Sequence, residues 1–168
     1  MTVEIRRLLP EDDRNPFRSG DESLDLFFHR YAGQNQFRHH IGVTYVAVES
    51  GRIVVFATVS AATVDPNVAR KRGVPYEVPV LRLARLAVDE AARGAGIGKA
   101  LLRHVLRLAV AMETDLGRAG VLVDAKPEAV EFYRKLGFAK IEVVEGALDS
   151  HPRSTPMLLN ISAIPRPQ

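Results

Sequence analysis

A short glycine-rich stretch in the middle of the chain carries the clearest chemical signal. Residues 93–98 read Arg-Gly-Ala-Gly-Ile-Gly, after a segment of strand character and before an amphipathic helical pattern. The first amides of a helix have no partner within it and carry a partial positive charge, so such a loop can bind an anion. The three glycines allow close approach to the backbone, and the arginine adds a positive charge at the rim. We therefore expect this loop to bind a diphosphate group.

The spacing of the glycines excludes two common phosphate-binding motifs. A P-loop needs Gly-x-x-x-x-Gly-Lys-Ser/Thr, but here Gly98 and Lys99 are followed by Ala100 and the glycine spacing differs. A dinucleotide-binding fold needs Gly-x-Gly-x-x-Gly with an acidic residue about 20 positions further on. The stretch lacks that spacing too and therefore belongs to another class of anion-binding loop.

Hydrophobic periodicity predicts the elements that position the loop. We expect strands at 3–8, 43–49, 53–62, 79–88, 121–124, 138–144 and 157–161. Helices are expected at 24–33, 99–113 and 127–136. This order predicts an α/β fold with a mixed sheet. We expect a single domain over residues 1–162, followed by a tail at 163–168.

The predicted ends of these helices rest on local signals. Asp21 or Ser23 could cap the first helix, whose apolar face would carry Leu24, Phe27, Phe28 and Tyr31 and which should end near Gly33. A polar, basic segment follows it. Gly137 is expected to be the left-handed residue that ends the last helix.

The composition is that of a globular protein that folds without metal or disulfides. The chain has 168 residues, of which 46% are hydrophobic and 26% charged, with a net charge of +3. The absence of cysteine excludes a disulfide framework, a thiolate nucleophile and a cysteine-ligated zinc site, and the five histidines show no ligand spacing. No apolar run reaches the roughly 20 residues needed to cross a membrane, and no signal peptide is visible. We expect a cytoplasmic protein.

Two sequence blocks resemble the GNAT N-acetyltransferase superfamily. Leu83-Ala84-Arg85-Leu86-Ala87-Val88-Asp89 and the 93–98 loop are similar to its acetyl-CoA-binding motif, Arg/Gln-x-x-Gly-x-Gly/Ala. Residues 129–138 are similar to its second signature, Ala-x-x-Phe-Tyr-x-x-x-Gly-Phe. The resemblance implies the GNAT acyl-CoA N-acyltransferase fold, a mixed sheet flanked by helices. It also implies direct transfer of an acetyl group from acetyl-CoA to a primary amine.

The resemblance assigns roles to particular residues. Tyr133 is implied as the general acid that protonates the departing thiolate, and a backbone N–H near the end of the central strand would stabilise the oxyanion. The expected coenzyme-binding residues are Leu86, Ala87, Val88, Arg93, Gly94, Ala95, Gly96, Ile97, Gly98 and Lys99. Conceivable general bases are Glu77, Asp89 and Asp124, each more simply explained as a solvated or capping carboxylate. Phe132 and Phe138 are expected in the core.

The N-terminal half resembles a subgroup of this superfamily, the toxins of toxin–antitoxin pairs that acetylate the amino acid carried on tRNA. The matching patches are Phe17-Arg18-Ser19-Gly20, residues 24–36, the Arg-Leu-Ala-Val-Asp before the loop and Val123-Asp124-Ala125-Lys126. This implies aminoacyl-tRNA as substrate, a ribbon-helix-helix antitoxin as partner and, by analogy, a homodimer.

The acceptor remains open between this and two other interpretations. Arg30, Arg38, Arg82 and Arg85 are candidates for contacts with tRNA phosphates, although each is also compatible with an ordinary solvated surface. A small-molecule or protein N-acetyltransferase without RNA contact is the first alternative. A non-catalytic coenzyme-A-binding module is the second, and Tyr133 argues against it.

Overall fold

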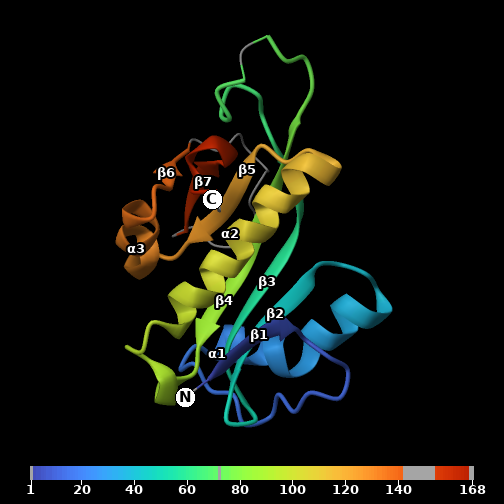
Figure 1. Cartoon of the computed structure of the whole chain (residues 1–168), viewed down its shortest axis with the longest axis vertical. Coiled ribbons are helices and arrows are strands. Elements are labelled where there is room, and N and C mark those ends of the chain that lie inside the picture. Colours follow the sequence, from blue (N-terminus) through green and yellow to red (C-terminus); the bar gives the residue numbers. More distant parts are fainter. Residues whose placement is uncertain (1, 72, 142–153, 167–168) are drawn as a thin grey trace. The chain divides into compact units, whose positions relative to one another are not determined.

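The protein divides into two compact units that share the central strands. The computed structural model describes residues 2–71, 73–141 and 154–166 (Figure 1). The first unit contains Met1–Ser60 and Leu83–Val105, and the second contains Ala61–Arg82 and Leu106–Gln168. The predicted boundary between a domain at 1–162 and a tail at 163–168 stays a prediction.

Seven strands of the described residues form the sheet, and their order along the chain confirms the predicted order of elements. They are β1 Val3–Arg7, β2 Val43–Glu49, β3 Arg52–Val64, β4 Val78–Val88, β5 Gly120–Ala125, β6 Ala139–Lys140 and β7 Thr155–Asn160. The sheet has the strand order β1-β2-β3-β4-β5-β7-β6. The long helix α2 (Ile97–Leu116) connects β4 to β5.

The first unit is built on two antiparallel strand pairs, β1 with β2 and β2 with β3. The turn between β2 and β3 has φ of 52° at Ser50 and 75° at Gly51. Positive φ at both central residues is typical of hairpin turns that match the twist of the strands. Four phenylalanine rings lie in the core of this unit, and Phe27 is one of them. Phe28 stacks on Phe56 at 4.4 Å between centroids, and Phe17 meets Phe28 edge-on at 5.0 Å.

A helical segment between β1 and β2 is longer than the sequence predicts. It starts as α1 (Glu22–Leu26), where the Asp21 carboxylate caps the amide of Leu24. It continues through two π-helical turns, η1 (Phe27–Tyr31) and η2 (Gln34–Arg38). The predicted end near Gly33 is wrong because the segment after it is helical. The Gln36 side chain stabilises this extension, since it donates to the carbonyl of Leu8 and accepts from the amide of Thr44.

The π-helical turns also change which side chains face the core. A π turn has i to i+5 hydrogen bonds, as between the Ala32 amide and the Phe27 carbonyl. The extra residue shifts the buried face, so Phe27, Phe28 and Ala32 are buried while Tyr31 is 47% exposed. The prediction that Tyr31 lies on the apolar face is therefore wrong.

The second unit pairs β7 with both β5 and β6, antiparallel in each case. Between β5 and β6 lie η4 (Pro127–Ala129) and α3 (Val130–Lys135), and α3 is followed by Gly137 with φ of +99°, as predicted. The strand predicted at 138–144 is shorter, because β6 contains only Ala139–Lys140. Its predicted end at 142–144 lies outside the described residues. No described helix combines the length and apolarity that a membrane-spanning helix needs.

Candidate active site

The expected anion-binding loop lies in the first unit, between the end of β4 and the start of α2. Gly94 and Gly96 have φ of 82° and 77°, a region that side chains with a Cβ rarely adopt. A Cβ built on either glycine would meet no heavy atom within 4 Å, so the backbone faces open space there. Both glycines therefore shape the loop and leave its amides accessible, which fits a bound diphosphate.

Gly98 has a different role from the one expected. It lies inside α2, and a Cβ there would come within 2.8 Å of Cγ2 of Val88 at the end of β4. This glycine allows the first turn of the helix to pack closely on the strand. Of the other loop residues, Ile97 is 8% exposed, while Ala95 and Lys99 lie on the surface.

The start of α2 has the electrostatics of an anion site. Its first intrahelical hydrogen bond runs from the Ala100 amide to the Gly96 carbonyl, at 3.1 Å. The amides of Ile97, Gly98 and Lys99 precede that bond and have no partner within the helix. The first turn holds no acidic side chain that would offset the dipole of this 20-residue helix. A ligand with negative charge would compensate the partial positive charge at the start of this helix.

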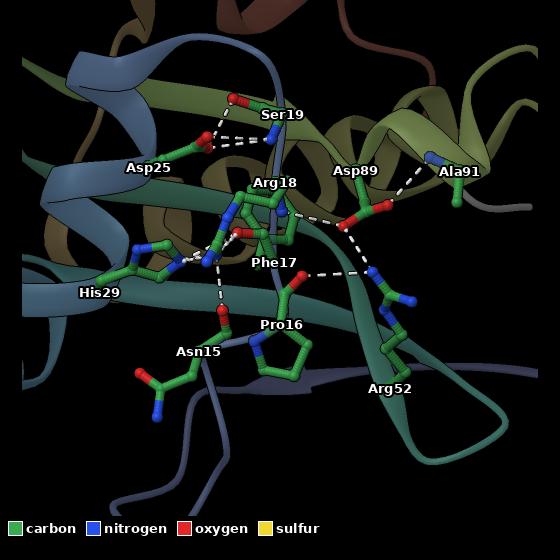
Figure 2. Close-up of polar contacts among 10 residues, drawn as sticks. All are labelled: Asn15, Pro16, Phe17, Arg18, Ser19, Asp25, His29, Arg52, Asp89 and Ala91. Carbon is green, nitrogen blue, oxygen red and sulfur yellow. Dashed lines mark hydrogen bonds and ion pairs between the residues drawn. The ribbon is translucent and has the colours of Figure 1, made fainter.

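The end of β4 leads directly into a buried carboxylate, Asp89, which is only 2% exposed. Its side chain accepts hydrogen bonds from the amides of Arg18 (3.0 Å) and Ala91 (2.9 Å) and from the Arg52 guanidinium (3.2 Å) (Figure 2). Burial alone would raise the pKa of Asp89, but the hydrogen bonds from the Arg18 and Ala91 amides and the charge of Arg52 outweigh it and lower the pKa. Every described contact of this carboxylate is structural, which confirms its interpretation as a capping group.

The other two residues named as conceivable bases, Glu77 and Asp124, also have interaction partners. Glu77 accepts a hydrogen bond from the Thr63 hydroxyl at 2.6 Å. Asp124 is likewise not a residue without a partner. No described carboxylate is therefore singled out as a general base.

Tyr133 lies in α3 of the second unit and is 6% exposed. Its ring contacts Phe132 and Phe138 edge-on, with centroids 5.2 Å and 5.4 Å away. Burial raises the pKa of the Tyr133 hydroxyl above its ordinary value, so the group is neutral and keeps its proton. Phe138 is in the core as expected, but Phe132 is 37% exposed, so its expected core position is wrong.

The four arginines named from the sequence are in different surroundings. Arg30 and Arg38 are exposed on η1 and η2. In the same unit, the Arg85 guanidinium lies 3.8 Å from the centre of the Phe27 ring, a cation–π contact. Arg82 is in the second unit, where its Nε is buried and makes no hydrogen bond within the described residues.

Sequence reasoning missed the residues that support the loop, namely Arg18, Ser19 and Arg52. Arg18 and Asp89 are 71 positions apart, and Arg52 and Asp89 are 37 apart, so no local spacing reveals their contact. The one signal in the sequence is the motif Phe17-Arg18-Ser19-Gly20, which contributes to the resemblance to the toxin subgroup but does not indicate these contacts. Across the described residues, no group of three His, Cys, Asp or Glu side chains could hold a metal ion.

Comparisons with known proteins agree with this geometry. Residues 40–140 match the family described as Acetyltransferase (GNAT) domain. The chain is 35% identical over 137 residues to a tRNA-acetylating toxin of Mycobacterium tuberculosis, an alignment covering 79% of this chain and 82% of that protein.

Solved structures of similar fold include "AtaT complexed with acetyl-methionyl-tRNAfMet", with a TM-score of 0.84, 22% identity and 97% of each chain covered. Another is "The crystal structure of KacTA-DNA complex", with a TM-score of 0.77, 25% identity and 97% and 96% of the two chains covered. The family match spans both the loop at 93–98 and Tyr133. The chain belongs to the GNAT acetyltransferase family.

Proposed function

We propose that this enzyme transfers the acetyl group of acetyl-CoA to the amino group of an aminoacyl-tRNA and acts as the toxin of a toxin–antitoxin pair. The observation that carries the proposal is the 35% identity over 137 residues with the mycobacterial tRNA-acetylating toxin. That alignment covers 79% of the chain, so it extends beyond the motifs that GNAT enzymes share.

The coenzyme diphosphate would bind at the start of α2. The amides that precede the first helical hydrogen bond would donate to its oxygens, and the helix dipole would favour its charge. The open space beside Gly94 and Gly96 and the absence of acidic residues in the first turn support this. Arg93 and Lys99, both exposed, would add positive charge at the rim.

The end of β4 would serve the reacting carbonyl group. We assign the donor for the carbonyl oxygen to a backbone amide within Leu86–Val88, by resemblance to the family. A fixed backbone N–H costs little reorganisation when negative charge develops on that oxygen. The Gly98 contact with Val88 supports the role, because it ties this strand end to the helix that would hold the diphosphate.

Tyr133 would act on the leaving group. In the proposed reaction a bond forms between the amine nitrogen and the carbonyl carbon, and the carbon–sulfur bond breaks. The sulfur takes the proton of the Tyr133 hydroxyl, and the proton that the nitrogen releases restores that hydroxyl. The Tyr133 hydroxyl is protonated at neutral pH, as any tyrosine of ordinary or raised pKa is, and so has a proton to donate. The α-amino group of an aminoacyl ester loses its own proton readily, which agrees with the absence of an assigned base.

The acceptor RNA would contact arginine side chains. Arg30, Arg38, Arg82 and Arg85 are the proposed phosphate contacts; Arg30 and Arg38 are the most accessible of them. Arg85 stacks on the Phe27 ring, which holds its guanidinium group in a defined position.

The proposed function also implies a protein partner, an oligomeric state and a cellular location. One solved structure of the same fold shows an AtaT mutant toxin bound to the C-terminus of the antitoxin AtaR and acetyl-CoA. We propose a small ribbon-helix-helix antitoxin for this chain, a homodimer as its assembly, and the cytoplasm, where aminoacyl-tRNA is found, as its location.

The test is direct analysis of the product. The purified protein is incubated with acetyl-CoA and a mixture of aminoacylated tRNAs, and the aminoacyl ends are analysed by mass spectrometry. We expect one or a few N-acetylated aminoacyl esters. Release of free coenzyme A with peptide or small-molecule amines, but no acetylated aminoacyl ester, would favour the alternative of an acetyltransferase without RNA contact.

A further inference from the structure

A short segment before α1 is fastened to the residues that lead into the coenzyme loop. We call Pro16–Gly20 the strap. The Arg18 amide donates to the Asp89 carboxylate at 3.0 Å, and the Glu90 amide donates to the Arg18 carbonyl at 2.8 Å. Figure 2 shows the strap running past Asp89 at the end of β4. This reciprocal pair fixes the strap against the start of η3 (Glu90–Ala92).

Arg52 ties the same two segments together from the other side. One nitrogen of its guanidinium lies 3.2 Å from both the Pro16 carbonyl and the Asp89 carboxylate (Figure 2). The second oxygen of Asp89 accepts from the Ala91 amide at 2.9 Å. One buried carboxylate thus joins the strap, the β2–β3 hairpin and η3.

The far end of the strap meets Arg93, the first residue of the coenzyme loop. The Arg93 guanidinium donates a hydrogen bond to the Ser19 carbonyl. At Gly20, with φ of +91°, a Cβ would lie 2.7 Å from Oε1 of Glu90 and 3.2 Å from the Arg93 guanidinium. The positive φ favours glycine at this position, and the ends of the Glu90 and Arg93 side chains lie directly against it.

The strap is also held on the side away from the loop. The Ser19 amide and hydroxyl donate to the Asp25 carboxylate in α1, at 2.9 Å and 2.7 Å. Ser19, whose carbonyl orients Arg93, is therefore held on both sides. Asp89 binds the amide of the neighbouring Arg18, and Asp25 binds the amide and hydroxyl of Ser19 itself.

We infer that Asp89 is a positioning residue for coenzyme binding, which holds the strap so that the Ser19 carbonyl keeps Arg93 in place beside the diphosphate site. The inference rests on the proposed function of the 93–98 loop. A side chain oriented before the ligand arrives loses less conformational freedom on binding, which strengthens affinity. Asp89 does this without contacting the ligand.

The test compares Asp89 with Asp12, a second carboxylate that accepts hydrogen bonds from an arginine side chain and a backbone amide. Asp12 accepts two hydrogen bonds from Arg6, at 2.8 Å and 2.9 Å, and one from the Leu9 amide at 2.7 Å, and none of its partners belongs to the strap or the loop. We expect Asp89→Asn to raise the dissociation constant of coenzyme A, measured by calorimetry, about fivefold or more. Asp12→Asn should leave it within about twofold, although both variants lose stability.

A second variant protects the test against misfolding of Asp89→Asn. Arg52 is half exposed, so Arg52→Ala should fold, and we expect it to weaken coenzyme binding in the same direction. Arg52→Lys, which keeps a cation with several donors, should restore part of the affinity.

A comparison of two acetyl donors separates weaker binding of the diphosphate from a general loss of structure. Acetyl-pantetheine has the thioester but no diphosphate. We expect Asp89→Asn to lower kcat/KM for acetyl-CoA and to leave kcat/KM for acetyl-pantetheine near that of the unsubstituted enzyme. Equal losses with both donors would contradict the inference, as would unchanged coenzyme affinity in both Asp89→Asn and Arg52→Ala. Failure of the unsubstituted protein to bind coenzyme A would overturn the proposed function as well.

Discussion

Tyr133 is a buried phenol, protonated at neutral pH, and burial raises its pKa further. Its ring lies between Phe132 and Phe138, and within the described residues its hydroxyl makes no hydrogen bond that would favour the ionised form. A phenol in such surroundings keeps its proton until a group that needs one comes within reach. This state suits a donor to a departing thiolate and does not suit a base.

The substitution Tyr133→Phe removes that proton and keeps the ring. We expect kcat to fall about tenfold or more, while the dissociation constant of coenzyme A changes little, because the hydroxyl would act on the leaving sulfur. Tyr45, which is 8% exposed in β2 and packs beside His104, is a buried tyrosine without a proposed role. Tyr45→Phe is therefore the control and should keep normal kcat. Normal turnover in Tyr133→Phe would remove this residue from the mechanism.

The sequence predicts which side chains are buried less well than it predicts helices and strands. Phe132 fits an apolar motif, yet α3 has only six residues and leaves that ring partly on the surface. Asp89 was correctly interpreted as a cap, but its partners Arg18 and Arg52 could not be predicted. Their contact depends on the path of the chain between them, which local spacing does not contain.

At the scale of elements, the strands and the helix after the loop were predictable, since β-branched runs and a 3.6-residue period mark them directly. The helical extension at 34–38 was not, because Gly33 and the polar residues after it are typical of a helix end. Hydrogen bonds from Gln36 to the backbone of Leu8 and Thr44 stabilise the extra turns. Those bonds exist only once β1 and β2 are in place.

The loop before α2 can be tested with two matched glycines. Gly96 and Gly51 have nearly equal φ, 77° and 75°, and a Cβ on either would meet no atom within 4 Å. Alanine at each position should therefore lower the free energy of unfolding by a similar amount, about 1–2 kcal/mol. Only Gly96→Ala should also raise the dissociation constant of coenzyme A, because it reorients the amides at the helix start. Equal coenzyme affinities in the two variants, measured by calorimetry beside thermal unfolding, would contradict a role of this loop.

On the scale of the whole molecule, the net positive charge is small. The net charge is only +3 in 168 residues, although 23 residues are lysine or arginine. Any affinity for RNA must therefore come from local groups of exposed cations, such as those on η1 and η2, because the total charge is too small to attract a polyanion strongly. Binding that relies on such groups depends on salt through the number of phosphates neutralised.

The salt dependence of binding to aminoacyl-tRNA can count those contacts. The logarithm of the binding constant falls linearly with the logarithm of salt concentration, by about 0.7–0.9 for each phosphate contact. Replacing Arg30 and Arg38 together by glutamine should reduce that slope by up to about 2 in filter-binding titrations between roughly 50 and 200 mM salt. Arg7→Gln, an exposed arginine on β1 with no proposed role, should leave the slope unchanged. An unchanged slope in the double variant would show that η1 and η2 make no phosphate contact, and the RNA would then have to bind through Arg82 and Arg85 or elsewhere.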